Sequence, residues 1–160
     1  MSWQTQLQEL GRGCNKIAVL GAGSVLCGDD AAGMLVVELL QAGAGENEAL
    51  LALPGSTAPE NFTGVLRDYQ PDLLLLVDAA FMEGELGEIR FLDAADIKGI
   101  NFSTHMLPLS VLVDYLRQET AAQVAVIGIQ PGTMDFDSEP SEEIRRSCQE
   151  LAAAILALFA

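Results

Sequence analysis

Short apolar runs alternate along the chain with segments of helical spacing. Runs of the length and composition typical of strands cover Lys16–Leu20, Ala49–Leu53, Leu73–Val77, Glu88–Leu92 and Gln123–Ile129. Helical spacing covers Asp30–Leu40, Pro59–Tyr69, Pro108–Leu116 and a last segment that starts near Ser138. Strands that alternate with helices in this way predict an α/β sandwich around a mainly parallel sheet.

Two of the predicted strands differ in their surroundings. Leu73–Val77 is continuously apolar, as expected of a central strand that is covered on both faces. Glu88–Leu92 alternates polar and apolar residues and follows a connection too short for a crossover helix. We therefore expect these two strands to form an antiparallel pair, which makes the sheet mixed. Pro54-Gly55 is expected to end the second strand.

Length and charge limit the function classes. The 160 residues predict one domain over 1–160, with 1–15 as an extension whose Trp3, Leu7 and Leu10 suit an amphipathic helix. The hydrophobic share of 50% excludes a disordered acidic tail. A net charge of −15 repels phosphate backbones, so we expect no nucleic-acid partner. Solubility alone would also explain this charge.

Cysteine spacing and apolar stretches favour a protein of the cytoplasm. Cys14, Cys27 and Cys148 lack the spacing of a thiolate zinc site or a disulfide framework, and Cys148 falls on an apolar helical stripe. No basic segment followed by an apolar run marks a secretory signal at the N-terminus. The longest apolar stretches are shorter than the roughly 20 residues that span a bilayer. We therefore expect a cytoplasmic monomer without a membrane partner.

Three segments place polar residues where α/β proteins bind ligands, beyond the carboxyl ends of strands. Gly28-Asp29-Asp30 closes the loop after the first strand, Asp78 ends the central strand, and His105 precedes a helix. Each has a structural explanation. Either aspartate of the first loop can cap the following helix. Asp78 can cap or form a turn, and the ring of His105 can bind the backbone.

The first loop resembles two nucleotide-binding motifs only in part. Gly21-Ala22-Gly23 begins a dinucleotide fingerprint, but Leu26 stands where its third glycine belongs. Gly23 and Gly28 have the spacing of a phosphate loop, but Asp29 and Asp30 replace its lysine and hydroxyl residue. Two carboxylates in these positions disfavour a nucleotide cofactor and suit a cation. With His105 and Asp78, they could hold a divalent transition metal, although the helical spacing of a zinc protease motif is absent.

These segments resemble the nickel–iron hydrogenase maturation endopeptidases of the hydrogenase-3 type over about residues 16–157. The matching stretches are Gly28-Asp29-Asp30-x-x-Gly33, Gly55-Ser56-Thr57-Ala58-Pro59-Glu60-Asn61, Leu75-Leu76-Val77-Asp78-Ala79, Gly87-Glu88-Ile89-Arg90, Thr104-His105-Met106-Leu107-Pro108-Leu109 and Gly128-Ile129-Gln130-Pro131. The resemblance implies a three-layer α/β sandwich with a twisted, mostly parallel five-stranded sheet flanked by helices. It also implies an endopeptidase that removes the C-terminal extension of a hydrogenase large-subunit precursor after nickel insertion.

The resemblance also implies the site. The nickel ligands of the family correspond to Asp30, Asp78 and His105, so Asp29 is not a ligand. The nickel is supplied by the precursor and serves as a recognition element, and Asp30 or Asp78 could act as the base of an aspartic-type mechanism. Ser24 and Ala31 depart from the asparagine and glycine usual in the family, which affects loop geometry more than activity. A non-catalytic nickel chaperone or sensor, and a nucleotide-binding module, are the competing functions.

Overall fold

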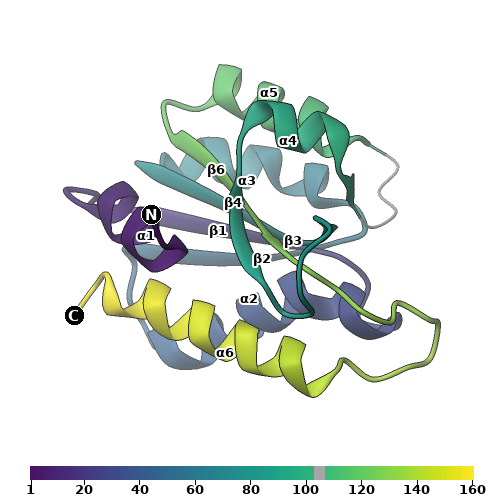
Figure 1. Cartoon of the computed structure of the whole chain (residues 1–160). Helices are drawn as coiled ribbons and strands as arrows, with labels where there is room; N and C mark the ends of the chain where they lie inside the picture. The colour runs from purple at the N-terminus through teal and green to yellow at the C-terminus, as the bar shows by residue number, and fades with distance from the viewer. Residues whose placement is uncertain (103–106) are drawn as a thin grey trace.

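A computed structural model describes residues 1–102 and 107–160 (Figure 1). Its main sheet has the strand order β2-β1-β3-β6-β4. The strands are β1 (Ile17–Ala22), β2 (Leu50–Ser56), β3 (Leu73–Phe81), β4 (Ile89–Leu92) and β6 (Gln123–Ile129). β2, β1, β3 and β6 run parallel, and β4 is antiparallel to β6. A two-residue strand, β5 (Asn101–Phe102), pairs with the end of β3.

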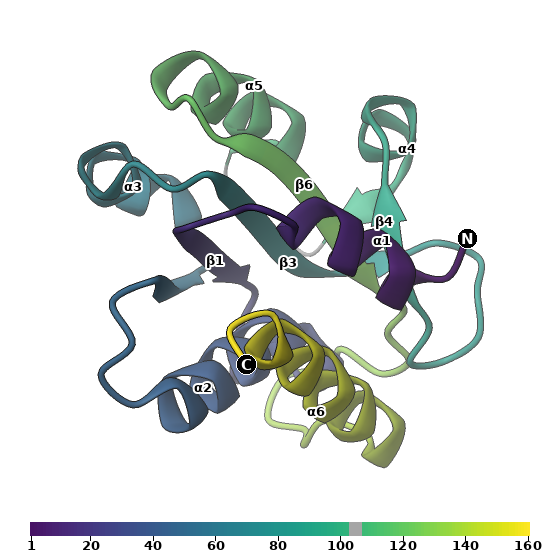
Figure 2. The same cartoon turned by 90° about the vertical axis from the view of Figure 1, so that its left-hand side faces the viewer.

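Helices cover both faces of this sheet, so the predicted α/β sandwich with its five-stranded, mostly parallel sheet is confirmed (Figure 2). On one face lie α2 (Ala32–Ala44) and α6 (Glu142–Ala157), and on the other lie α3 (Thr63–Tyr69), α4 (Ala94–Gly99) and α5 (Leu109–Glu119). Two 3-10 helices, η1 (Gly28–Ala31) and η2 (Pro59–Phe62), follow β1 and β2. None of the helices in the described part of the chain is both long and apolar enough to cross a membrane.

The alternation of side chains along β3 divides the core into two layers. Leu73, Leu75 and Val77 face the layer that α2 and α6 cover, whereas Leu74 and Leu76 face the other layer. All five are buried. A strand covered on both faces needs apolar residues at successive positions, which explains the continuous apolar run that the sequence shows here.

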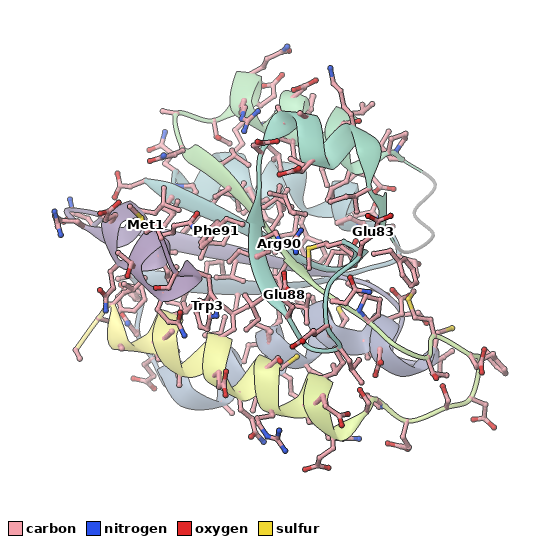
Figure 3. The ribbon with its side chains drawn as sticks, in the orientation of Figure 1. Met1, Trp3, Glu83, Glu88, Arg90 and Phe91 are labelled. Atoms are coloured by element: carbon pink, nitrogen blue, oxygen red, sulfur yellow. The ribbon has the colours of Figure 1, made fainter. Side chains whose placement is uncertain are left out.

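The N-terminal extension forms the predicted amphipathic helix, α1 (Trp3–Gly11). Its Leu7 is buried, and the helix packs against β4 and α6. Trp3 of α1 and Phe91 of β4 both contact the core layer under α6, and Figure 3 shows them on the same side of the molecule. α1 thus covers part of the sheet that α2 and α6 leave open.

Several predicted boundaries are wrong for physical reasons. β2 continues through Pro54 and Gly55, because it lies at the edge of the sheet, where a missing N–H breaks no ladder bond. β3 continues to Phe81, so Asp78 lies inside the strand rather than at its end. The strand Glu88–Leu92 does run antiparallel, but its ladder partner is β6, which inserts between it and β3.

The helical boundaries shift as well. The predicted helix from Asp30 divides into η1 and α2, and the last helix begins at Glu142 instead of near Ser138. α4 was not predicted, although it starts with a capping box between Asp93 and Asp96. This helix has only six residues, which is too short for apolar periodicity to reveal it.

Candidate active site

The carboxyl ends of the parallel strands lie at one edge of the sheet, and the predicted acidic residues lie there. Asp30 is in η1, directly after β1, and Asp78 is in the adjacent strand β3. η1 packs against β3, so the two segments that carry these acids are in contact. Both aspartates are almost fully buried, with 4% and 1% of their surfaces exposed.

Only one of the two carboxylate oxygens of Asp30 is hydrogen-bonded to a described residue. Its Oδ2 accepts a hydrogen bond of 3.0 Å from the backbone N–H of Ser24. Its Oδ1 is buried, and none of the described residues donates to it. Burying a carboxylate oxygen without a partner costs free energy, which a cation or a proton donor would recover. Ser24 contributes here through its backbone, so the asparagine usual in the family is not needed for this bond.

Glycines allow the first loop to approach the sheet this closely. Gly23 has φ +127°, and a Cβ at this position would lie 1.9 Å from the carbonyl oxygen of Asp30. A Cβ on Gly33 would lie 2.3 Å from the carbonyl oxygen of Val77 and 2.4 Å from that of Ala22. Ala31, where the family has glycine, is in the right-handed helical region, so an alanine fits without strain.

Asp78 occupies a central position among the strand ends. Register pairs Val77 with Gly21 of β1, and Asp78 itself with Gly128 of β6. Gly128 is in turn paired with Arg90 of β4. Because paired residues lie on the same face of a sheet, Asp78 and Arg90 share a face, with only a glycine between them. His105, the third predicted site residue, lies outside the described residues.

Asp29, which was not assigned as a ligand, joins the first loop to the segment between β6 and α6. Its Oδ2 accepts a hydrogen bond of 2.8 Å from Gly132 N–H, and its Oδ1 accepts one of 2.7 Å from Ser141 N–H. In return, its own N–H donates to the carbonyl of Thr133. The sequence allowed Asp29 to cap the helix that follows it. Instead, the side chain of Asp29 fixes the loop before α6. Its two donors lie more than a hundred residues away, so no local pattern could reveal them.

Cys148 lies on α6 and is a core residue, as predicted. It is fully buried, and its Sγ donates to the carbonyl of Ala32, which begins α2. Burial and the nearby charge of Asp29 raise the pKa of the Cys148 thiol to about 12. The thiol therefore stays protonated and unreactive at neutral pH, which excludes it as a nucleophile.

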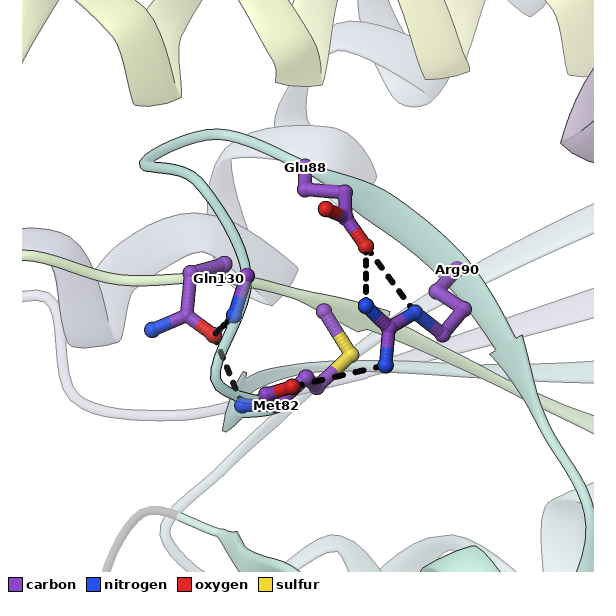
Figure 4. Close-up of polar contacts among 5 residues, drawn as sticks. Met82, Glu88, Arg90 and Gln130 are labelled. Atoms are coloured by element: carbon purple, nitrogen blue, oxygen red, sulfur yellow. Dashed lines mark hydrogen bonds and ion pairs between the residues drawn. The ribbon is translucent and has the colours of Figure 1, made fainter.

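A buried amide holds the loop between β3 and β4 at the edge of the site (Figure 4). Gln130 Oε1 accepts from the N–H groups of Met82 and Gly84, at 2.7 and 3.2 Å, and its Nε2 donates to the carbonyl of Pro131. Arg90 donates to Glu88 and to the carbonyl of Met82 from the other side. We predicted no role for Gln130, although it belongs to one of the stretches that resemble the family.

Two of the three expected ligands, Asp30 and Asp78, are of a chemistry that a divalent transition metal accepts. Two adjacent segments carry the carboxylates of Asp30 and Asp78, and the unpartnered Oδ1 of Asp30 is the kind of atom that a cation would satisfy. Within residues 1–102 and 107–160, no three acids, cysteines or histidines gather into a metal site. The third ligand expected from the sequence, His105, is outside these ranges.

Comparison with known proteins decides the family. The sequence profile of the hydrogenase maturation proteases matches residues 34–158. A protein of Methanocaldococcus jannaschii, provisionally described as such a protease, is 34% identical over 154 residues, which cover 92% of this chain and 90% of that one. The chain belongs to the hydrogenase maturation protease family. The hydrogenase 3 maturation protease of Escherichia coli K12 is 37% identical over 119 residues, 74% of each chain.

Solved structures of such maturation proteases share the fold. The crystal structure of the [NiFe] hydrogenase maturation protease HycI from Thermococcus kodakarensis superposes with a TM-score of 0.87 at 34% identity, over 96% of this chain and 97% of that one. The solution structure of the endopeptidase HycI from E. coli gives 0.78 at 31% identity, over 91% and 92%. The protein is therefore a hydrogenase maturation endopeptidase, a hydrolase of peptide bonds, as the resemblance implied.

Proposed function

We propose that this protein removes the C-terminal extension from the large-subunit precursor of a nickel–iron hydrogenase, after nickel has been inserted. In this proposal Asp30, Asp78 and His105 contact the nickel of the precursor and so distinguish loaded from empty substrate. The observation that supports it best is the buried, unpartnered Oδ1 of Asp30, beside the strand that carries Asp78. An oxygen of this kind is available to a metal that arrives with the substrate.

In this mechanism Asp30 and Asp78 would have different roles. The nickel, when present, would polarise a water molecule or the scissile carbonyl. Asp30 would keep one oxygen on the N–H of Ser24 and use the other toward the metal or the attacking water. Asp78, buried at the same edge, would serve as a second ligand or as the base. The family's peptidase activity and the chemistry of carboxylates support these roles.

Mass spectrometry of a cognate precursor tests the proposal. Nickel-loaded and nickel-free precursors are incubated with the protein, and the loss of the C-terminal peptide is measured. We expect cleavage of the loaded form only, with at least a hundredfold loss of rate in His105→Ala and in Asp30→Asn. Asp68→Asn, an exposed acid on α3, is the matched control and should cleave at the wild-type rate.

Two results would contradict the proposal. Equal cleavage of the nickel-loaded and nickel-free precursors would show that the protease does not recognise nickel. Binding of the loaded precursor without any change in its mass would favour the nickel sensor instead of the protease.

A further inference from the structure

Exposed apolar side chains gather on the loops around Asp29 and Asp30. Val25 and Leu26 follow β1, Leu86 lies between β3 and β4, and Phe136 lies between β6 and α6. Their exposed fractions are 61%, 58%, 41% and 75%. We call these four residues the apolar rim. Where such exposed apolar residues form a contiguous patch, they are typical of a surface that binds a partner.

Hydrogen bonds show that the three loops of the apolar rim meet. The carbonyl of Leu26 accepts from Asp137 N–H at 2.7 Å, which places Phe136 beside the first loop. Leu86 lies against Gly132, and Gly132 N–H donates to Asp29. Val25 is next to Ser24, whose N–H donates to Asp30. The apolar rim is therefore continuous with the loop that holds the candidate catalytic acid.

The charges around the apolar rim have one sign. The segments 21–33, 81–88 and 131–141, which carry it, contain no lysine or arginine. Exposed acids flank the apolar residues: these are Glu83, Glu85, Asp135, Asp137 and Glu139. The nearest arginines, Arg90 and Arg145, are already paired with Glu88 and Glu139. A partner that covers this surface must supply apolar side chains and its own positive charges.

We propose that the apolar rim binds a segment of the precursor in which large apolar side chains are flanked by lysine or arginine. This inference rests on the proposed function and adds to it the part of the substrate that is recognised apart from the metal. The apolar side chains would contact Leu26 and Phe136, and the basic flanks would lie near Glu85 and Asp137. Such a contact binds substrate without taking part in the bond cleavage, so it affects KM rather than kcat.

Direct binding of synthetic peptides tests the chemistry of the partner. Three fluorescein-labelled peptides are titrated with the protein: one with a Leu-Phe centre and Lys/Arg flanks, one with Glu flanks, and one with a Ser centre. We expect the first to bind at least tenfold more tightly than the other two, and to weaken as salt rises. Similar affinity for all three peptides, or no binding of the first, would overturn the inference.

Variants locate the contact. Leu26→Ser, Phe136→Ser and Glu85→Lys should each weaken binding of the first peptide about fivefold or more, as the loss of a central interface contact does. Tyr115→Ser on α5 and Glu46→Lys between α2 and β2 are matched controls, exposed on elements that do not carry the apolar rim, and should bind as wild type. Because all five positions are exposed, the melting temperatures should stay close to that of the wild type.

Precursor cleavage separates this inference from the proposed function. With nickel-loaded precursor, the rim variants should raise KM by a similar factor and leave kcat unchanged. Cleavage with unchanged KM would overturn the docking role while the protease function stands. Peptide binding by a wild-type protein that cleaves no precursor would instead contradict the protease function and leave the docking surface in place.

Discussion

Asp29 and Asp30 are adjacent acids with different hydrogen bonding. Both oxygens of Asp29 accept backbone N–H groups, whereas Asp30 has one oxygen bonded and one without a donor among the described residues. The first arrangement stabilises the fold, and the second leaves part of a buried carboxylate unsatisfied. Buried polar groups without a hydrogen-bond partner are found at functional sites, because activity there requires an arrangement that lowers the stability of the fold.

Amide substitutions should separate the two roles. Asp29→Asn replaces an acceptor by a donor that faces an N–H group, so we expect the free energy of unfolding to fall by about 2 kcal/mol. Asp30→Asn keeps an acceptor for Ser24 and removes a buried charge, so stability should stay equal or rise while peptidase activity is lost. Urea denaturation measures the first effect and precursor cleavage the second. Equal destabilisation by both substitutions would contradict this assignment.

A second prediction concerns Asp72, which binds the chain where the N-terminal extension enters β1. Its Oδ2 accepts from the N–H groups of Lys16 and Asn15, at 2.9 and 2.8 Å, and these bonds lower the pKa of Asp72 from its usual 3.8. A lowered folded-state pKa means that the stabilisation is complete above pH 3.8 and is lost as the pH falls through the folded value.

Asp72→Asn should therefore melt at a lower temperature than the wild type at pH 7. The difference should shrink as the pH falls below 3.8 through the lowered pKa of folded Asp72, because the wild-type carboxyl is then protonated and accepts more weakly. Thermal melts from pH 7 down to the lowest pH at which both proteins fold would measure this. Asp68→Asn serves as the control without the backbone bonds, and a difference that is constant with pH would contradict the assignment.

The location of a residue in the fold was predictable from the sequence where the neighbouring residues in the chain determine it. Asp30 and Asp78 follow apolar runs, and this placed them at the right edge of the sheet. The role of Asp29 was not predictable, because Gly132 and Ser141 donate to it from more than a hundred residues away. The same holds for Gln130, whose partners lie on a different loop.

At the scale of elements, the close packing of α2 onto β1 and β3 depends on Gly33, which faces Gly21 of β1. Because a Cβ on Gly33 would meet backbone oxygens of both strands, no side chain can move aside to make room. We expect Gly33→Ala to lower the free energy of unfolding by about 3 kcal/mol and to displace η1, with loss of peptidase activity.

Gly64→Ala in α3 is the matched control for Gly33→Ala. A Cβ there meets only the end of the Arg67 side chain at 3.7 Å, so alanine should leave stability unchanged or raise it by up to about 1 kcal/mol. Chemical denaturation and precursor cleavage would be measured for both variants. A Gly33→Ala protein with wild-type stability and rate would show that the helix can shift without consequence.

Elements were predictable where local pattern determines them. Gln123–Ile129 has the predicted bounds, and the β-type runs all became strands. β3 extends to Phe81 because its last residues pair with β6 and β5. This pairing cannot be predicted from the residues of β3 alone. The partner of β4 was missed for the same reason, since pairing order is a property of the whole sheet.

For the whole molecule, the net charge of −15 opposes compaction through mutual repulsion. We expect the melting temperature to rise by a few degrees between about 10 and 200 mM NaCl, because the screening length falls from roughly 30 Å to below 10 Å. Differential scanning calorimetry would measure it, with an equal osmolarity of sucrose as a comparison. A melting temperature that falls or stays constant with NaCl would show that repulsion does not limit stability.

The hydrogen bonds of Asp29 also have a consequence for the order in which the protein is made. Residues 23–30 leave the ribosome more than a hundred residues before Gly132 and Ser141, whose N–H groups fix Asp29. β4 likewise lacks its ladder partner until β6 has emerged. The loop of Asp30 therefore lacks part of its support until Ser141 has emerged. A growing chain that has not yet reached Ser141 should therefore lack peptidase activity.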